Sequence, residues 1–343
     1  LMAVKLTDEE RVAARTVDFN IHEYKDPEWC DKVIPLLVSL IEHLGCFELG
    51  IDRETLFRFF VRVRMLYRIV PYHNWYHAAD VVQTMFLFIQ SLNDTTVFST
   101  LDKYILLIAA SLHDVDHMGV NNSFHLKTDT PMGILVSCTG SMSVLEIHHC
   151  NIAMEVLKDP QTNAFHSLKT EQTTYALRSM VNIILATDMA RHGDISKAFK
   201  ELPNLADEKE EDIPAHKIQF MQMLIKSCDV SNVMKPFPVA RLWAIAVTEE
   251  FYTQGDMEKE KGLDILPMFD RQKADLAKGQ IGFIDFLAIH QFNAMSDWFP
   301  GLSWAKEGAA ATRKVWQGIA DEQAALLKAE TEAAAVKDEE KKP

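Results

Sequence analysis

The chain contains 343 residues, of which 48% are hydrophobic and 24% are charged, and this composition is ordinary for a globular protein with a large core. The formal net charge of −14 argues against a nucleic-acid partner or an anionic membrane surface, because both require an excess of Lys and Arg. The five cysteines lack a C-x-x-C spacing, so we expect reduced thiols and a cytoplasmic location. The most apolar stretch, residues 104–112, is too short to cross a bilayer, and we expect no transmembrane segment.

Helical periodicity dominates the chain. Residues 55–67 place one apolar stripe at offsets of three, four, seven and eleven residues, and the stripe consists of Leu56, Phe59, Phe60, Val63 and Tyr67. Four more segments predict helices, the first two of them buried: residues 78–92, 103–112, 172–185 and 218–226. No hairpin signal and no alternation of strands with helices is found, so the predicted fold class is all-α.

Two polar segments interrupt this pattern. Residues 193–217 and 254–280 combine charge with Pro or Gly, and they predict long loops, the first of them with room for one short helix. Residues 309–343 are rich in Ala, Glu and Lys and predict a charged C-terminal helix that frays into a tail. Because no repeat or low-complexity linker divides the chain, we expect a single domain over residues 1–343, with its helical core at about residues 55–305.

Residues of the types that commonly bind metals occur at three separate positions along the sequence. His73 and His77 are four residues apart, so on a helix they share one face, although such pairs are more often partly exposed helix residues. The run His113-Asp114-Val115-Asp116-His117 follows the buried segment 103–112. Burying this run without compensation would be costly, and a divalent metal supplies the compensation; a charged helix end open to water is the alternative.

Asp229 follows the apolar run at residues 220–225 and, taken alone, is equally explained as a helix cap or a turn residue. Together with His77, His113 and Asp114 it completes a set of two imidazoles and two carboxylates. Such a set leaves metal positions open for water, which is typical of a catalytic site. In residues 279–286, the Gln280 amide could hydrogen-bond a purine edge while the Phe283 ring stacks on its face. The alternative interpretation is a helix that begins here beside core phenylalanines.

With these motifs in view, the chain resembles the catalytic domain of class I 3′,5′-cyclic nucleotide phosphodiesterases, from about residue 55 to residue 304. The motifs that carry the resemblance stand in the family's order: His73-Asn74…His77, His113-Asp114-Val115-Asp116-His117, Glu146, Thr187-Asp188, Asp229 and Gln280…Phe283. In detail the sequence is more similar to a kinetoplastid member of type C than to a mammalian isoform. The resemblance implies the compact HD/PDEase fold of about 16 helices and a single catalytic domain.

The resemblance also implies a role for each matched position. A tightly bound metal, usually Zn²⁺, would be held by His77, His113, Asp114 and Asp229. Asp114 would bridge to a second ion, Mg²⁺ or Mn²⁺, whose waters would be oriented by His117, Glu146, Thr187 and Asp188. His73 would be the general acid. The substrate would be bound by Gln280, Phe283, Val247, Asn232, Tyr72 and Met189.

The implied reaction is hydrolysis of cAMP, and also of cGMP, to 5′-nucleoside monophosphates by a hydroxide held between the two metals. Regulatory domains that flank such catalytic domains are expected to lie outside this sequence, and the oligomeric state stays open. Three positions depart from the commonest pattern, and they bear on base preference and pocket shape: Met118, Val233 and Ala244.

Three other functions compete with this interpretation. An HD-type metal phosphohydrolase acting on other nucleotides would share the metal ligands but would not need Gln280 and Phe283. A non-catalytic cyclic-nucleotide sensor would have no use for a general acid at His73. A scaffold protein would explain only the charged C-terminal segment and the acidic loop, which are usually solvated surface.

Overall fold

The computed structural model describes residues 4–26, 32–92, 97–202 and 213–339, and 74% of the chain is helical with no strand in the described ranges. This confirms the all-α prediction. The first eight helices are α1 (Asp8–Ala13), α2 (Val33–His43), α3 (Arg53–Leu66), α4 (Trp75–Ser91), α5 (Thr100–Leu112), α6 (Asn122–Lys127), α7 (Pro131–Ser137) and α8 (Val144–Lys158). The others are α9 (Thr170–Leu185), α10 (His192–Lys200), α11 (Ile213–Asp229), α12 (Phe237–Glu260), α13 (Leu276–Phe283), α14 (Ile289–Trp298) and α15 (Ser303–Glu339).

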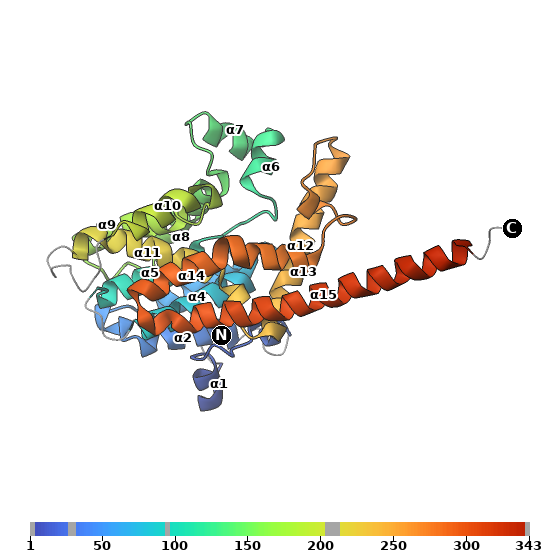
Figure 1. Cartoon of the computed structure of the whole chain (residues 1–343). Helices are drawn as coiled ribbons and strands as arrows, with labels where there is room; N and C mark the ends of the chain where they lie inside the picture. The colour runs from blue at the N-terminus through green and yellow to red at the C-terminus, as the bar shows by residue number, and fades with distance from the viewer. Residues whose placement is uncertain (1–3, 27–31, 93–96, 203–212, 340–343) are drawn as a thin grey trace.

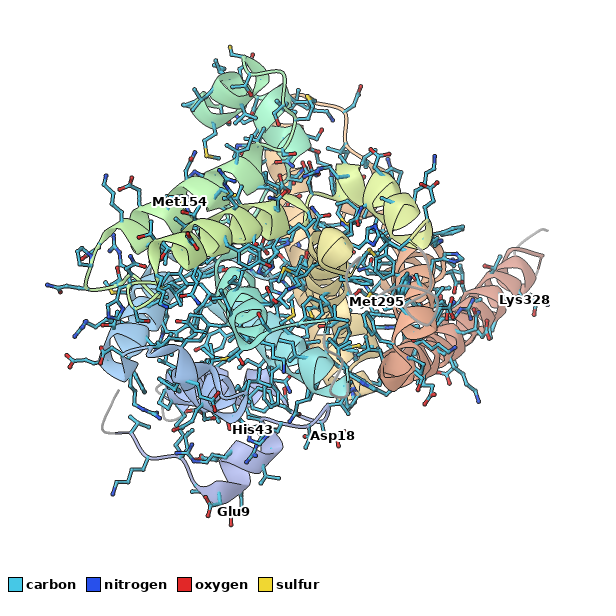
Figure 2. All side chains as sticks on the ribbon, turned by 90° about the vertical axis from the view of Figure 1, so that its left-hand side faces the viewer. Glu9, Asp18, His43, Met154, Met295 and Lys328 are labelled. Atoms are coloured by element: carbon cyan, nitrogen blue, oxygen red, sulfur yellow. The ribbon has the colours of Figure 1, made fainter. Side chains whose placement is uncertain are left out.

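Helices α4 and α5 lie at the centre of the molecule, and helices on both sides cover them (Figure 1). Every residue of α5 from Tyr104 to Leu112 is buried, as the apolar character of this run requires. Ser99 caps this helix: its side chain accepts a hydrogen bond from the Asp102 N–H, and Asp102 in turn accepts one from the Ser99 N–H. One hydrophobic cluster runs through the molecule from Ala14 to Ala320, and side chains fill the space between the helices (Figure 2).

In the described residues, both segments predicted as loops are helical at their ends, while residues 261–275 form a loop that contains only the short 3-10 turn Pro267–Phe269. In residues 193–217 the structure has most of α10 and the start of α11, while residues 203–212 lie outside the described ranges. In residues 254–280, α12 continues to Glu260 and α13 begins at Leu276. Gly255 sits inside α12 because a Cβ there would lie 2.0 Å from the Phe269 carbonyl oxygen, so this glycine allows close backbone packing and does not mark a turn.

The C-terminal segment forms one long helix, α15, which begins earlier than predicted. Its first half packs on the molecule, where Trp316 and Ala320 are buried and Arg313 forms a bidentate ion pair with Asp285. From residue 321 to residue 332 every side chain is exposed, and the helix projects away from the other helices (Figure 1). In the described part of the chain, no helix combines the length and the apolar character needed to cross a membrane.

Candidate active site

Four predicted metal ligands come from three helix ends that meet at one point. His77 lies in the first turn of α4, where the Asn74 side chain accepts hydrogen bonds from the N–H groups of Tyr76 and His77. His113 is the C-terminal cap of α5, and Asp114 follows it. Asp229 is the last residue of α11. Residues far apart in the sequence are therefore presented by three helix ends. The shared helix face expected for His73 and His77 is not found, because α4 begins at Trp75 and His73 precedes its N-cap.

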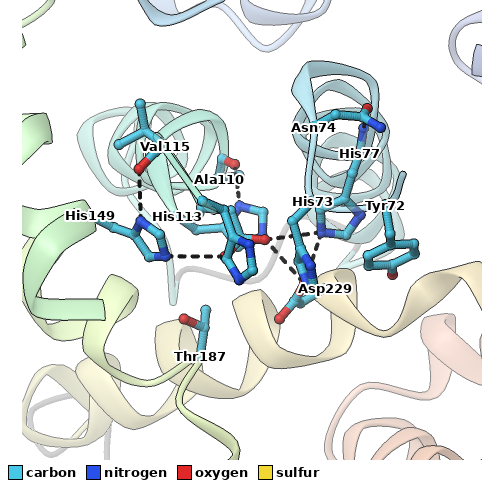
Figure 3. A network of polar contacts seen from close by, with 12 residues as sticks. Tyr72, His73, Asn74, His77, Ala110, His113, Val115, His149, Thr187 and Asp229 are labelled. Atoms are coloured by element: carbon cyan, nitrogen blue, oxygen red, sulfur yellow. Dashed lines mark hydrogen bonds and ion pairs between the residues drawn. The ribbon is translucent and has the colours of Figure 1, made fainter. Parts of the chain in front are cut away.

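The ligand atoms of this group converge closely, all lying within 4.8 Å of one another (Figure 3). Asp229 Oδ1 is 3.1 Å from His77 Nε2 and 3.3 Å from His113 Nε2. Asp114 Oδ2 is 3.1 Å from His113 Nε2 and 3.5 Å from His77 Nε2. Two imidazoles and two carboxylates thus face one small volume, which is the donor set that a divalent cation prefers.

Two further observations show that this cluster fits a cation. Asp114 Oδ2 is buried, yet it meets no donor in good hydrogen-bond geometry. The His113 Nδ1–H donates to the Ala110 carbonyl oxygen at 2.8 Å, so its Nε2 lone pair points toward the carboxylates. Metal-binding histidines are commonly oriented in this way, by a hydrogen bond from the ring nitrogen that does not bind the metal.

Without a cation, the carboxylates of the cluster are ionised and the His113 ring is protonated. Burial acts to raise the pKa of Asp114, but the neighbouring His113 and His77 rings outweigh it and hold that pKa well below its ordinary value. Burial acts to lower the pKa of His113, and Asp114 and Asp229 raise it well above its ordinary value instead. A cation and a proton therefore compete for His113 Nε2, and cation binding would release the proton.

His73 is held beside this cluster by Glu250 of α12. The Glu250 carboxylate accepts hydrogen bonds from the backbone N–H of Tyr72 at 2.9 Å and of His73 at 3.1 Å, and its other oxygen pairs with His73 Nδ1. Burial acts to lower the pKa of His73, but the charge of Glu250 raises it to about 9. The ring is therefore protonated at neutral pH, as a general acid must be.

His117 lies face to face with His73, with ring centroids 4.0 Å apart and planes inclined by 24°. Its Nδ1 accepts a hydrogen bond from the Gly119 N–H at 3.0 Å. Burial, together with the charge of His73, lowers the pKa of His117 well below its ordinary value. A neutral ring in this position can keep its Nε2–H for a neighbouring oxygen.

Three polar residues line the opposite side of the same space. Burial and the nearby Asp188 raise the pKa of Glu146 to about 7, and Glu146 accepts a hydrogen bond from Asn122 Nδ2 at 2.9 Å. Asp188 accepts hydrogen bonds from the Ser143 hydroxyl and, at 2.8 Å, from the Ala190 N–H. The Thr187 hydroxyl donates to the Ile184 carbonyl oxygen at 2.7 Å, which leaves its lone pairs free for a water.

A cavity of about 720 Å³ joins these groups. The predicted residues that line it are Tyr72, His73, Asp114, His117, Glu146, Thr187, Asp188, Met189, Asp229, Val247 and Phe283. Gln280 and Asn232 line an adjoining pocket of about 400 Å³, which shares Tyr72, Val247 and Phe283 with the first. The polar centre therefore adjoins a largely apolar pocket whose lining includes Gln280.

Comparison with known proteins decides the family. Residues 72–308 match the family described as 3′5′-cyclic nucleotide phosphodiesterase. The chain belongs to this family. Among solved structures, this chain is similar to a Leishmania protein whose structure is described as LmjPDEB1 in complex with IBMX. The two superimpose with a TM-score of 0.86 at 43% identity, and the match covers 93% of this chain and 100% of the Leishmania chain. This likeness supports the kinetoplastid placement, and the finer assignment to type C stays a prediction.

Curated relatives are similar over most of this chain. The high affinity cGMP-specific 3′,5′-cyclic phosphodiesterase 9A of Mus musculus is 36% identical over 270 residues, which are 77% of this chain and 49% of the relative. The cGMP-specific 3′,5′-cyclic phosphodiesterase of Drosophila melanogaster is 31% identical over 331 residues, which are 92% of this chain and 28% of the relative. The chain thus spans half or less of the length of these phosphodiesterases.

Two sequence interpretations of the phosphodiesterase site need changing. Val233 and Ala244 were expected to influence the base pocket, but both are buried in the core, and neither lines the two cavities of the described chain. Glu250 was missed. It lies on the same face of α12 as the buried Trp243 and the half-buried Val247, at helical spacings of four and three residues, so a carboxylate in line with apolar residues was the available signal.

Proposed function

We propose that this chain hydrolyses 3′,5′-cyclic nucleotides, both cAMP and cGMP, to 5′-nucleoside monophosphates. The observation that carries the proposal is the convergence of His77, His113, Asp114 and Asp229 within 4.8 Å, beside a cavity that continues to Gln280. Family membership supports the same reaction class. Residues 1–343 would form a single catalytic domain of a longer cytoplasmic protein that carries regulatory domains.

The geometry supports a set of metal ligands. The four clustered side chains would hold the tighter ion, for which the mixed nitrogen and oxygen donor set favours Zn²⁺. Asp114 would reach a second ion, Mg²⁺ or Mn²⁺, whose waters His117, Glu146, Thr187 and Asp188 would orient from across the cavity. When bound, such ions lower the pKa of a water molecule and offset the charge on the phosphoryl group.

His73 would act as the general acid. Its pKa of about 9 keeps the ring protonated at neutral pH, and it lines the cavity beside Asp114 and Asp229. The leaving group is the ribose 3′ oxygen, which departs poorly as an alkoxide and would take its proton from this imidazolium. Glu250 would compensate the charge of the ring before the transfer and fix its position through Nδ1.

The base would enter the apolar pocket. Gln280 would bind the purine edge through its amide, with Phe283 and Val247 on opposite faces of the ring. The pocket would be completed by Tyr72, Asn232 and Met189. Within the described ranges no side-chain hydrogen bond fixes the Gln280 amide, which favours acceptance of both purines, because either orientation of the amide is open.

A turnover assay tests the proposal. The purified chain is supplied with Zn²⁺ and Mg²⁺ and assayed on cAMP and cGMP, with dATP and a cyclic dinucleotide as comparison substrates. We expect 5′-AMP and 5′-GMP as products, no turnover after EDTA treatment and recovery on addition of Mg²⁺ or Mn²⁺. Turnover of dATP or the dinucleotide alone would indicate a different phosphohydrolase, and binding without turnover would indicate a sensor.

A further inference from the structure

Lys226 is a buried cation with no role in the mechanism above. It lies on α11 three residues before Asp229, so both side chains occupy one face of the helix. Its exposed fraction is only 3%, although lysine is among the residues least often buried. In a chain of net charge −14, a buried ammonium one turn from a proposed metal ligand requires a structural reason.

The ammonium is directed at the far wall of the cavity. Lys226 Nζ donates to the carbonyl oxygen of Ala186 at 3.0 Å. Ala186 is the C-terminal cap of α9, where backbone carbonyls lack partners within the helix. The next two residues are Thr187 and Asp188, which line the same cavity as Asp229. Thr187 lies on the same side of the imidazole rings as Asp229 (Figure 3). This single contact therefore ties the turn bearing Thr187 and Asp188 to the helix bearing Asp229.

The charges around the ammonium are mostly negative. Burial lowers the pKa of Lys226, while Asp229, Asp188 and Glu146 act in the opposite direction. The carbonyl of Leu185, one residue before Ala186, accepts from the exposed Arg191 guanidinium at 3.0 Å. Two cations thus bind the end of α9, which is the favourable sign at a helix C-terminus, but only Lys226 is buried toward the acidic groups.

We propose that Lys226 is a positioning residue for the second cation site, holding Thr187 and Asp188 at a fixed separation from Asp229 through the Ala186 carbonyl. This inference rests on the proposed function, since it assigns the far wall of the cavity to the waters of a second ion. The opposite reading is that Lys226 only reduces the negative charge of the site. The two readings predict opposite signs, because loss of a nearby positive charge tightens cation binding, whereas loss of the tether loosens it.

Lys226→Met removes the ammonium and keeps most of the side-chain length. We expect the variant to keep one Zn²⁺ per chain and to bind Mn²⁺ roughly ten-fold more weakly, the lower end of the effect of removing groups that support metal ligands. Its kcat should be reduced at limiting Mn²⁺ and should recover toward wild type at high Mn²⁺. General loosening of the fold would not give that recovery.

Lys217→Met is the matched control. Lys217 also lies on α11 and also joins it to a neighbouring helix, through an ion pair of 2.8 Å with the buried Asp102 of α5. It does not line the cavity. We expect this variant to unfold at a lower temperature while keeping the wild-type Mn²⁺ affinity.

The experiment is a titration of each zinc-loaded protein with Mn²⁺, followed by the electron paramagnetic resonance signal of free Mn²⁺, with turnover measured on the same samples. Wild-type protein that neither binds Mn²⁺ nor turns over would contradict the proposed function itself. Active wild type with equal or tighter Mn²⁺ binding in Lys226→Met would overturn the positioning role. Should the methionine variant not fold, Lys226→Gln tests the same contact, because its shorter neutral side chain removes the ammonium from Ala186, and the same weakening is expected.

Discussion

The pair formed by His73 and Glu250 gives the sharpest test of the acid assignment. Glu250→Gln keeps the shape of the side chain and an oxygen that can accept the backbone N–H groups of Tyr72 and His73, but it removes the negative charge. Burial acts to lower the pKa of His73, and the Glu250 charge raises it to about 9. Without that charge, we expect the pKa of the ring to fall to its ordinary 6.5 or below.

The size of the effect follows from the protonated fraction. At pH 7.5 a group with a pKa of 9 is about 97% protonated, whereas one with a pKa of 6.5 is about 9% protonated, so kcat/KM should fall roughly ten-fold. The pair also stabilises the fold. Because the folded pKa of His73 is raised and that of Glu250 is lowered, this stabilisation is lost as the pH rises through about 9 and is lost again in acid, where Glu250 becomes protonated.

The assay is the pH dependence of kcat/KM between pH 5.5 and 10. In the wild type we expect activity to decline as the pH rises through about 9, and in Glu250→Gln the decline should begin more than two pH units lower. Glu258→Gln is the matched control, since Glu258 is equally buried on α12 but accepts its hydrogen bond from Gln254. An unchanged alkaline limb in Glu250→Gln would refute the reasoning.

Four more variants test other parts of the site and the packing of α12. His73→Ala should retain zinc and lose roughly 10²–10⁴-fold in kcat, whereas Asp229→Ala should lose zinc as well; wild-type kcat in zinc-loaded His73→Ala would show that the acid is another group. Gln280→Ala should chiefly raise KM for both cyclic nucleotides, measured by initial rates, and an unchanged KM would remove its proposed contact with the base. Gly255→Ala should lower the free energy of unfolding by about 1–3 kcal/mol, because the new Cβ meets the Phe269 carbonyl oxygen; denaturant titration measures it, and no loss of stability would contradict the close packing.

The metal cluster could be predicted from the sequence because each part carries its own signal. His113 and Asp114 stand at the end of an apolar run that had to be buried, and Asp229 stands at the end of another. Burying imidazole and carboxylate side chains at helix ends costs free energy unless they have partners, so the sequence favoured their convergence on a shared cation. The periodicity also predicted that these helices exist, and α5 ends at Leu112, as expected, whereas α5 and α11 begin before the predicted residues.

The groups that support the cluster could not be predicted in the same way, because their partners are set by tertiary packing. Glu250 contacts the backbone of His73 from 177 residues away. Lys226 contacts a backbone carbonyl oxygen, and because every residue has such an oxygen, the sequence does not indicate which one is the partner. Gly255 illustrates the same limit: a glycine that permits close packing in a helix has the same sequence signal as one that permits a turn.

The central claim is that His77, His113, Asp114 and Asp229 jointly hold a divalent ion. Anomalous diffraction from crystals of the zinc-loaded protein, collected on both sides of the zinc absorption edge, locates such an ion directly. The account predicts an edge-dependent peak between the four side chains, within about 2.0–2.2 Å of the ring nitrogens and carboxylate oxygens. A map with no peak there, or with zinc bound only elsewhere on the chain, would contradict it.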